Sequence, residues 1–197
     1  MTASPTLRSL SGLPQQPASL AESTLVLIDF QNTYTTGVME LEGWAPALEA
    51  AADLLARARA AGAAVIHVVH DDGPGTPYDI SGESGAIHPA VAPLDGEPIV
   101  VKHAPNAFVG TELGDLVDAA GREEIVIAGF MTHMCVTFTA EGAFLRGNRP
   151  TVVASATATR SLPTPYGDVP AAQLHRSALA TIGDLYAVVV PGADDLR

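Results

Sequence analysis

The stretch Ile125-Val126-Ile127-Ala128-Gly129-Phe130-Met131-Thr132-His133-Met134-Cys135-Val136 decides the fold. It begins with a continuous apolar run, which is typical of a strand that is buried on both faces of a parallel sheet. Gly129 interrupts the run, and beyond Cys135 the pattern becomes helical, because Val136, Thr139, Ala140, Ala143 and Phe144 can share one face. The pattern therefore predicts a buried strand that turns into a helix, with the only cysteine of the chain at the turn.

A thiol at the start of a helix has a chemical use. Free backbone N–H groups and the helix dipole lower the pKa of a thiol there and favour an anion. Such a nucleophile can attack a carbonyl carbon while nearby N–H groups hold the developing oxyanion. The alternative is that Cys135 is a small buried hydrophobic side chain, as most lone cysteines are. The thiol alone leaves both interpretations open.

The composition excludes several classes of protein. The chain has 197 residues and 47% hydrophobic residues, enough for one domain with a sizeable core, and its net charge of −12 argues against nucleic-acid and anionic-membrane partners. A single cysteine cannot form an internal disulfide, and no apolar run reaches membrane-spanning length. The first twenty residues lack the apolar core of a signal peptide. We therefore expect a cytoplasmic protein.

The apolar pattern predicts an α/β fold. Strands are expected at residues 24–28, 63–70, 99–101, 151–154 and 185–190 besides the run at Ile125, with helices between them. This alternation indicates a three-layer structure in which a six-stranded, mainly parallel sheet has helices on both faces. We expect residues 1–23 to form an N-terminal arm and residues 24–197 a single domain. Two irregular segments, 71–97 and 155–168, interrupt the alternation, and the first has the length of a lid.

Three chemically useful residues lie at or just past the carboxyl ends of separate predicted strands: Asp29, Lys102 and Cys135. In a parallel sheet these ends share one edge, where ligands bind. Asp29 can take the proton of the thiol, and Lys102 can hold the carboxylate and favour the thiolate. Water attack on the resulting thioester would complete a hydrolysis. Each residue also has an ordinary structural explanation, as a loop carboxylate, a solvated lysine and a core thiol.

The six histidines do not form a recognisable metal motif. None belongs to an HExxH pattern, and no second cysteine is present. His67 and His70 would point to opposite faces of one strand, so we expect them to be structural or loop residues rather than joint ligands. His133 lies two residues before Cys135 and either lines the pocket or lies on the surface. No metal and no cofactor is expected.

Several segments match a known family in order and spacing. They are Leu27-Ile28-Asp29-Phe30-Gln31, Val101-Lys102 with Asn106-Ala107-Phe108, Gly129 to Val136 with Thr139-Ala140, and Ala156-Thr157-Ala158-Thr159. Together they resemble the isochorismatase-like cysteine hydrolase superfamily, which includes nicotinamidases and N-carbamoylsarcosine amidases. The resemblance covers residues from Leu25 to about Val190.

The resemblance implies a catalytic triad of Asp29, Lys102 and Cys135 in a six-stranded parallel sheet. It also implies a cis peptide bond between Phe130 and Met131, with the backbone N–H groups of Met131 and Cys135 as the oxyanion hole. By position it indicates a substrate pocket. Trp44 is a looser candidate for this pocket, the alternative being an aromatic side chain that covers the core or contacts another subunit. The pocket residues are Gln31, Tyr34, Phe108, Thr132 and His133.

The same resemblance implies a homodimer or homotetramer acting on a small-molecule substrate. The metal motif of nicotinamidases is absent after the second strand, where the chain reads His70-Asp71-Asp72-Gly73-Pro74-Gly75. We therefore expect a metal-independent cysteine hydrolase that cleaves an amide-type C–N bond. The alternatives are hydrolysis of an isochorismate-like vinyl ether, and a non-catalytic binder of small molecules on the same scaffold.

Overall fold

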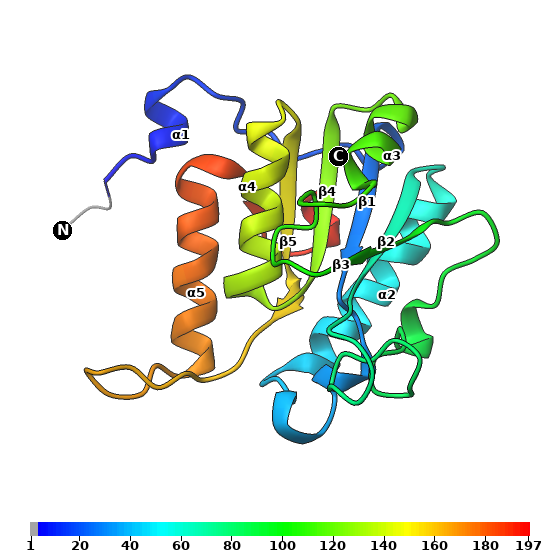
Figure 1. Cartoon of the computed structure of the whole chain (residues 1–197). Helices are drawn as coiled ribbons and strands as arrows, with labels where there is room; N and C mark the ends of the chain where they lie inside the picture. Colours follow the sequence, from blue (N-terminus) through cyan, green and yellow to red (C-terminus); the bar gives the residue numbers. More distant parts are fainter. Residues whose placement is uncertain (1–3) are drawn as a thin grey trace.

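The computed structural model describes residues 4–197 and contains a six-stranded parallel sheet with the strand order β3-β2-β1-β4-β5-β6 (Figure 1). The predicted fold class is confirmed. The strands are β1 (Ser23–Ile28), β2 (Ala64–His70), β3 (Ile99–Lys102), β4 (Glu124–Phe130), β5 (Arg149–Ala158) and β6 (Val188–Val190). The helices are α1 (Leu7–Leu10), α2 (Trp44–Ala60), α3 (Leu113–Ala120), α4 (Thr137–Leu145) and α5 (Ala171–Thr181).

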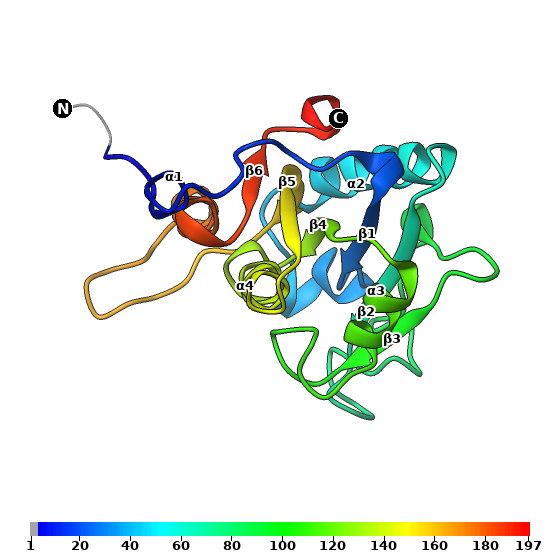
Figure 2. The same ribbon diagram turned by 90° about the horizontal axis from the view of Figure 1, so that it is seen from above.

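Alternate residues of the central strands supply two separate cores. Leu25 and Leu27 of β1 belong to the core that includes the apolar face of α2, whereas Val26 and Ile28 belong to the core that includes α3 and α4. Figure 2 shows the resulting layers, with α2 on one face of the sheet and α3 and α4 on the other. Because β1 and β4 are covered on both faces, every residue in them is buried, which explains their continuous apolar sequence.

Two predicted boundaries differ from the structure. Residues 155–158, expected in a loop, continue β5, because a register shift between Ile127 and Gly129 lets Gly129 pair with Thr157. The last strand is shorter than expected, because residues 182–186 form a π-helical turn before β6 begins at Val188. Both differences arise from pairing between segments that are distant in sequence.

The N-terminal arm lies against the domain, as far as the structure describes it; its residues 1–3 lie outside the described part. The Arg8 side chain is buried and donates hydrogen bonds to the carbonyls of Pro14 and Leu185. The N–H of Ala18 donates to the Thr151 hydroxyl, and the carbonyl of Ala18 accepts from the N–H of Arg197. The arm thus crosses the amino-terminal end of the sheet, opposite the edge that carries the candidate site.

The segment 71–97 is irregular apart from a 3-10 turn at Pro89–Val91 and an isolated antiparallel bridge between Ile87 and Gln31. It is nevertheless attached to the loop that follows β1. The N–H groups of Asn32 and Thr33 donate to the carbonyls of Ala86 and Ser84, and the N–H of His88 donates to the carbonyl of Phe30. This segment therefore packs next to the carboxyl end of β1. No helix in residues 4–197 has both the length and the apolar character needed to cross a membrane.

Gly129 lies where β4 runs close beside β1. Its φ is +153°, and a Cβ at this position would lie 2.3 Å from the carbonyl oxygen and 2.7 Å from the Cβ of Ile28. Both strands are buried on two faces, so neither can move aside. This close approach explains the interruption of the apolar run by glycine.

We predict that Gly129→Ala lowers the free energy of unfolding by about 3 kcal/mol or more, because the added methyl group overlaps the backbone of β1. Urea unfolding followed by circular dichroism measures the change. Gly183→Ala is the matched control, since its Cβ would lie at an ordinary 3.5 Å from Cγ2 of Val189. A Gly129→Ala protein as stable as the control would contradict the close approach of the strands.

Candidate active site

The structure brings Asp29, Lys102 and Cys135 together at the carboxyl edge of the sheet. Asp29 directly follows β1, Lys102 is the last residue of β3, and Cys135 lies between β4 and α4. The Lys102 Nζ is 2.8 Å from Oδ2 of Asp29 and 3.3 Å from Sγ of Cys135. Lys102 and Cys135 are also the only lysine and the only cysteine of the chain.

Cys135 lies in a π-helical turn, Thr132–Val136, which joins β4 to α4. The carbonyl of Met131 accepts hydrogen bonds from the N–H groups of Met134 at 3.0 Å and Val136 at 3.3 Å. The peptide bond between Phe130 and Met131 is cis. The turn places the thiol beside the end of β1, with 7% of the residue exposed.

Asp29 has an unusual backbone and a buried side chain. Its φ of +53° lies in the left-handed region, which aspartate tolerates better than most residues, and its N–H donates to the carbonyl of Val68 at 2.8 Å. The side chain is completely buried, and apart from the ion pair with Lys102 neither carboxylate oxygen has a hydrogen-bond partner within residues 4–197. A carboxylate in this state has lone pairs free to accept a proton.

The three groups influence one another strongly. Burial raises the pKa of Asp29 above its usual value, although the charge of Lys102 opposes this effect. Burial acts to lower the pKa of Lys102, but the attraction to Asp29 and Cys135 outweighs burial, so the pKa is raised. The ammonium therefore remains charged, and the buried carboxyl group is a stronger base than an exposed one.

The expected lowering of the thiol pKa is wrong for this structure. Burial, followed by the negative charge of Asp29, raises the pKa of Cys135 to about 12, although Lys102 acts in the opposite direction. The helix-start argument failed because it considered only the N–H groups of the turn and neglected the loss of water around the sulfur. The thiol is therefore protonated at neutral pH.

Sequence reasoning missed His70, the last residue of β2, which was expected to be structural. Its Nδ1 is 3.2 Å from Nζ of Lys102, and its Nε2 is 2.9 Å from Oδ1 of Asp72. A signal was present, because His70 pairs with Lys102 in the register of β2 and β3. The ring of Tyr78 packs edge-on against His70 with 5.0 Å between ring centroids, and nothing in the irregular segment around Tyr78 could have indicated this contact.

Two of the predicted pocket residues are buried near the triad. The Gln31 amide nitrogen donates to the carbonyls of His70 and Gly85, and its oxygen accepts from the N–H of His70. The side chain of Gln31 is thus fully engaged with the backbone. Tyr34 packs edge-on against Phe130 and Tyr78, and its hydroxyl is 3.5 Å from that of Tyr78.

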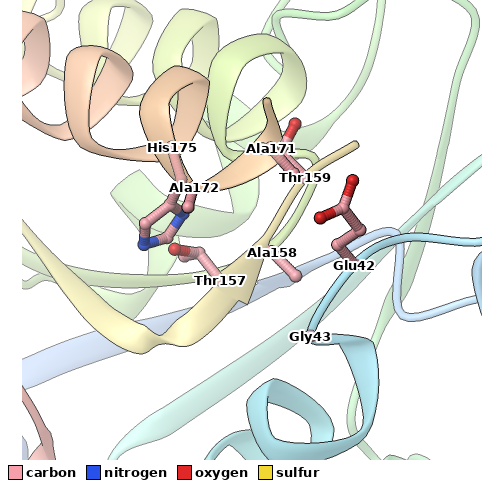
Figure 3. A pocket seen from close by; sticks show the side chains of 8 residues that line it. All are labelled: Glu42, Gly43, Thr157, Ala158, Thr159, Ala171, Ala172 and His175. Atoms are coloured by element: carbon pink, nitrogen blue, oxygen red, sulfur yellow. The ribbon is translucent and has the colours of Figure 1, made fainter. Parts of the chain in front are cut away.

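Thr132 and His133 lie beside a cavity of about 300 Å³. The Thr132 hydroxyl is 2.9 Å from Nδ1 of His175, and Nδ1 of His133 is 2.6 Å from the Thr159 hydroxyl. Figure 3 shows the cavity between the end of β5, the start of α5 and the residues before α2. Its lining consists of Glu42, Gly43, Thr157, Ala158, Thr159, Ala171, Ala172 and His175. Cys135 is not part of this lining. The cavity nevertheless adjoins the turn that carries the thiol, because Thr132 and His133 belong to that turn and contact lining residues.

The remaining predicted residues lie in other environments. Phe108 packs against the α3 and α4 core, and the guanidinium of Arg146 lies over its ring at 5.3 Å. Trp44 begins α2, and its ring centroid lies 6.5 Å from that of His88. Within residues 4–197, no group of three or more histidine, cysteine, aspartate or glutamate side chains is arranged to hold a metal ion.

The family model described as the isochorismatase domain matches residues 23–194. A solved structure described as an isochorismatase from Pseudomonas putida KT2440 superposes with a TM-score of 0.95 and 36% identity, over 99% of this chain and 100% of that one. The secreted isochorismatase effector Isc1 of Verticillium dahliae is 36% identical, over 95% of this chain and 97% of that protein. Maleamate amidohydrolase of Pseudomonas putida is 34% identical, over 66% of this chain and 68% of that enzyme.

The fold and the matches together define a hydrolase whose parallel sheet brings Asp29, Lys102 and Cys135 together at its carboxyl edge. The chain belongs to the isochorismatase family.

We predict that Asp29→Asn makes Cys135 more reactive toward iodoacetamide at pH 8. The charge of Asp29 raises the thiol pKa, so its removal lowers that pKa from about 12 and increases the thiolate fraction, by roughly tenfold per pKa unit. Mass spectrometry measures the alkylation rate, since the chain has only one cysteine.

Asp53→Asn is the control for that experiment, because Asp53 pairs with Arg57 on the exposed surface of α2. Its alkylation rate should equal that of the unmodified protein. Slower alkylation of Asp29→Asn than of this control would contradict the electrostatic coupling between the carboxylate and the thiol.

Proposed function

We propose that this protein hydrolyses an amide-type C–N bond of a small molecule through a thioester on Cys135. The observation that carries the proposal is the position of the Lys102 ammonium, which contacts both the Asp29 carboxylate and the Cys135 sulfur. The match to an enzyme named maleamate amidohydrolase supports the amide class of substrate.

In the first step Asp29 takes the proton of the thiol, and the thiolate so formed then attacks the carbonyl carbon. Before transfer the negative charge is on Asp29, and afterwards it is on the sulfur. Both positions contact the same ammonium, so the reaction moves a charge within one ion pair and does not create an isolated buried charge. This arrangement makes a thiol with a pKa of about 12 usable at neutral pH.

Attack gives a tetrahedral oxyanion, which the backbone N–H groups of Met131 and Cys135 stabilise. When this intermediate collapses, the C–N bond breaks and the protonated Asp29 gives its proton to the leaving amine. Water then attacks the thioester carbonyl with Asp29 again as the base. The carboxylic acid product leaves and the thiol is restored. The 300 Å³ cavity beside Thr132 and His133 offers space for part of the substrate next to the reacting turn.

Vinyl-ether hydrolysis is the second candidate, because the solved structure with 36% identity is described as an isochorismatase. This reaction needs no thiol nucleophile. Assays of the Cys135→Ala protein with isochorismate and with maleamate separate the two, since ether cleavage without the thiol would favour this candidate. The cytoplasmic location and the homodimeric or homotetrameric state remain proposals from the sequence.

We predict that Cys135→Ala and Cys135→Ser reduce amide hydrolysis by about 10³-fold or more, because no group can form the thioester. Asp29→Asn and Lys102→Ala should be nearly as damaging, since the three residues act as one unit. Ammonium release from maleamate and related small amides measures turnover, and mass spectrometry of the quenched reaction detects an acyl adduct on Cys135.

Asp53→Asn should retain full activity in this assay, and thermal unfolding verifies that each variant is folded. Full amide hydrolysis by a folded Cys135→Ala protein would refute the thioester mechanism. A Cys135 that is inert to both substrate and alkylating reagents would instead favour the non-catalytic binder.

A further inference from the structure

The Lys102 ammonium has three N–H donors and three partners. Asp29 lies at 2.8 Å, Cys135 at 3.3 Å and Nδ1 of His70 at 3.2 Å. Lys102 is completely buried, so water does not supply a substitute acceptor. Three partners therefore fix the position of the ammonium. Asp29 and Cys135 take part in the proposed reaction, and the third partner is His70.

An ammonium group can only donate hydrogen bonds, so Nδ1 of His70 must be unprotonated to accept one. In a neutral imidazole the proton then lies on Nε2, which is 2.9 Å from a carboxylate oxygen of Asp72. Asp72 accepts a hydrogen bond from this N–H and so stabilises the tautomer that Lys102 requires. The two contacts of the ring are consistent with a single protonation state.

The backbone and the ring of His70 are both held in place. The Gln31 amide accepts from the N–H of His70 and donates to its carbonyl, each at 2.9 Å. The ring packs edge-on against Tyr78, and the residue itself pairs with Lys102 across the β2–β3 ladder. The Gln31 amide thus fixes the backbone of His70, the residue that faces Lys102.

We propose that His70, as a neutral imidazole fixed by Asp72 and Gln31, is a positioning residue that holds the Lys102 ammonium between Asp29 and Cys135. The kinetic part of this inference rests on the proposed function, whereas the arrangement of His70 and Lys102 does not.

Loss of the His70 ring removes the third acceptor and leaves one N–H of the buried ammonium without a partner. Because Lys102 then loses its fixed position between Asp29 and Cys135, the activity is expected to fall.

The experiment uses the fact that Lys102 is the only lysine, so protein labelled with ¹⁵N-lysine gives one Nζ resonance. Detection through the carbon-bound Hε protons avoids loss of the signal by exchange with water. In His70→Leu the Lys102 signal should shift and broaden relative to the unmodified protein, because one N–H of the ammonium has lost its acceptor. His67→Leu is the matched control and should leave the signal unchanged, because His67 lies in the same strand but contacts Glu97 at 3.0 Å.

Kinetics provide the second measurement. We predict that His70→Leu lowers kcat about tenfold or more with a nearly unchanged KM, the scale of one lost hydrogen bond to a charged group. His70→Asn should recover most of the activity and the Lys102 signal of the unmodified protein, because its amide oxygen can take the place of Nδ1.

A Lys102 signal that is unchanged in His70→Leu, or a His70→Leu enzyme with the unmodified kcat, overturns the inference. Failure of the proposed function would give a different result. The unmodified protein would then hydrolyse no amide, while the Lys102 signal would still change in His70→Leu.

Discussion

The site depends on one buried ammonium group, that of Lys102, which contacts both the Asp29 carboxylate and the Cys135 thiol. A lysine with no exposed surface is destabilising unless its charge is compensated and its donors are satisfied. Asp29 provides the compensating charge, and Cys135 and His70 accept the remaining hydrogen bonds. Because the same ammonium contacts the base and the nucleophile, the proton can move between them without a change in the net charge of the site. The elevated pKa of the thiol therefore does not prevent the proposed chemistry.

The parallel sheet makes this meeting possible. β1 and β3 are separated by β2, so Lys102 must reach past the end of β2 to contact Asp29. The residue at that end is His70, which explains why a histidine, rather than water, is the neighbour of the lysine. The segment 71–97 then returns over the carboxyl end of β1 and places Gly85 against the Gln31 amide. Sheet order and loop path together determine which groups surround the ammonium.

Much of the fold could be predicted because buried parallel strands have a distinct sequence. The continuous apolar runs of β1 and β4 predicted two-sided burial, and the alternation with helical patterns predicted the layers. The same reasoning placed Asp29, Lys102 and Cys135 at one edge, since each follows or ends a strand. It failed for the end of β5, where the structure of residues 155–158 depends on a register shift in β4. It also failed for the thiol pKa, because burial is a property of the folded site.

The sequence by itself determined the fold class, the common edge of the three reactive residues and the family resemblance, because strand periodicity and motif spacing are encoded locally. Only the tertiary structure decided the protonation of Cys135, the contact of His70 with Lys102 and the engagement of Gln31 with the backbone. These depend on desolvation and on distances between segments that no pattern along the chain records. The physical reason is that electrostatic and hydrogen-bonding energies are set by the surroundings of a group in space, whereas sequence patterns report mainly which face of an element is buried.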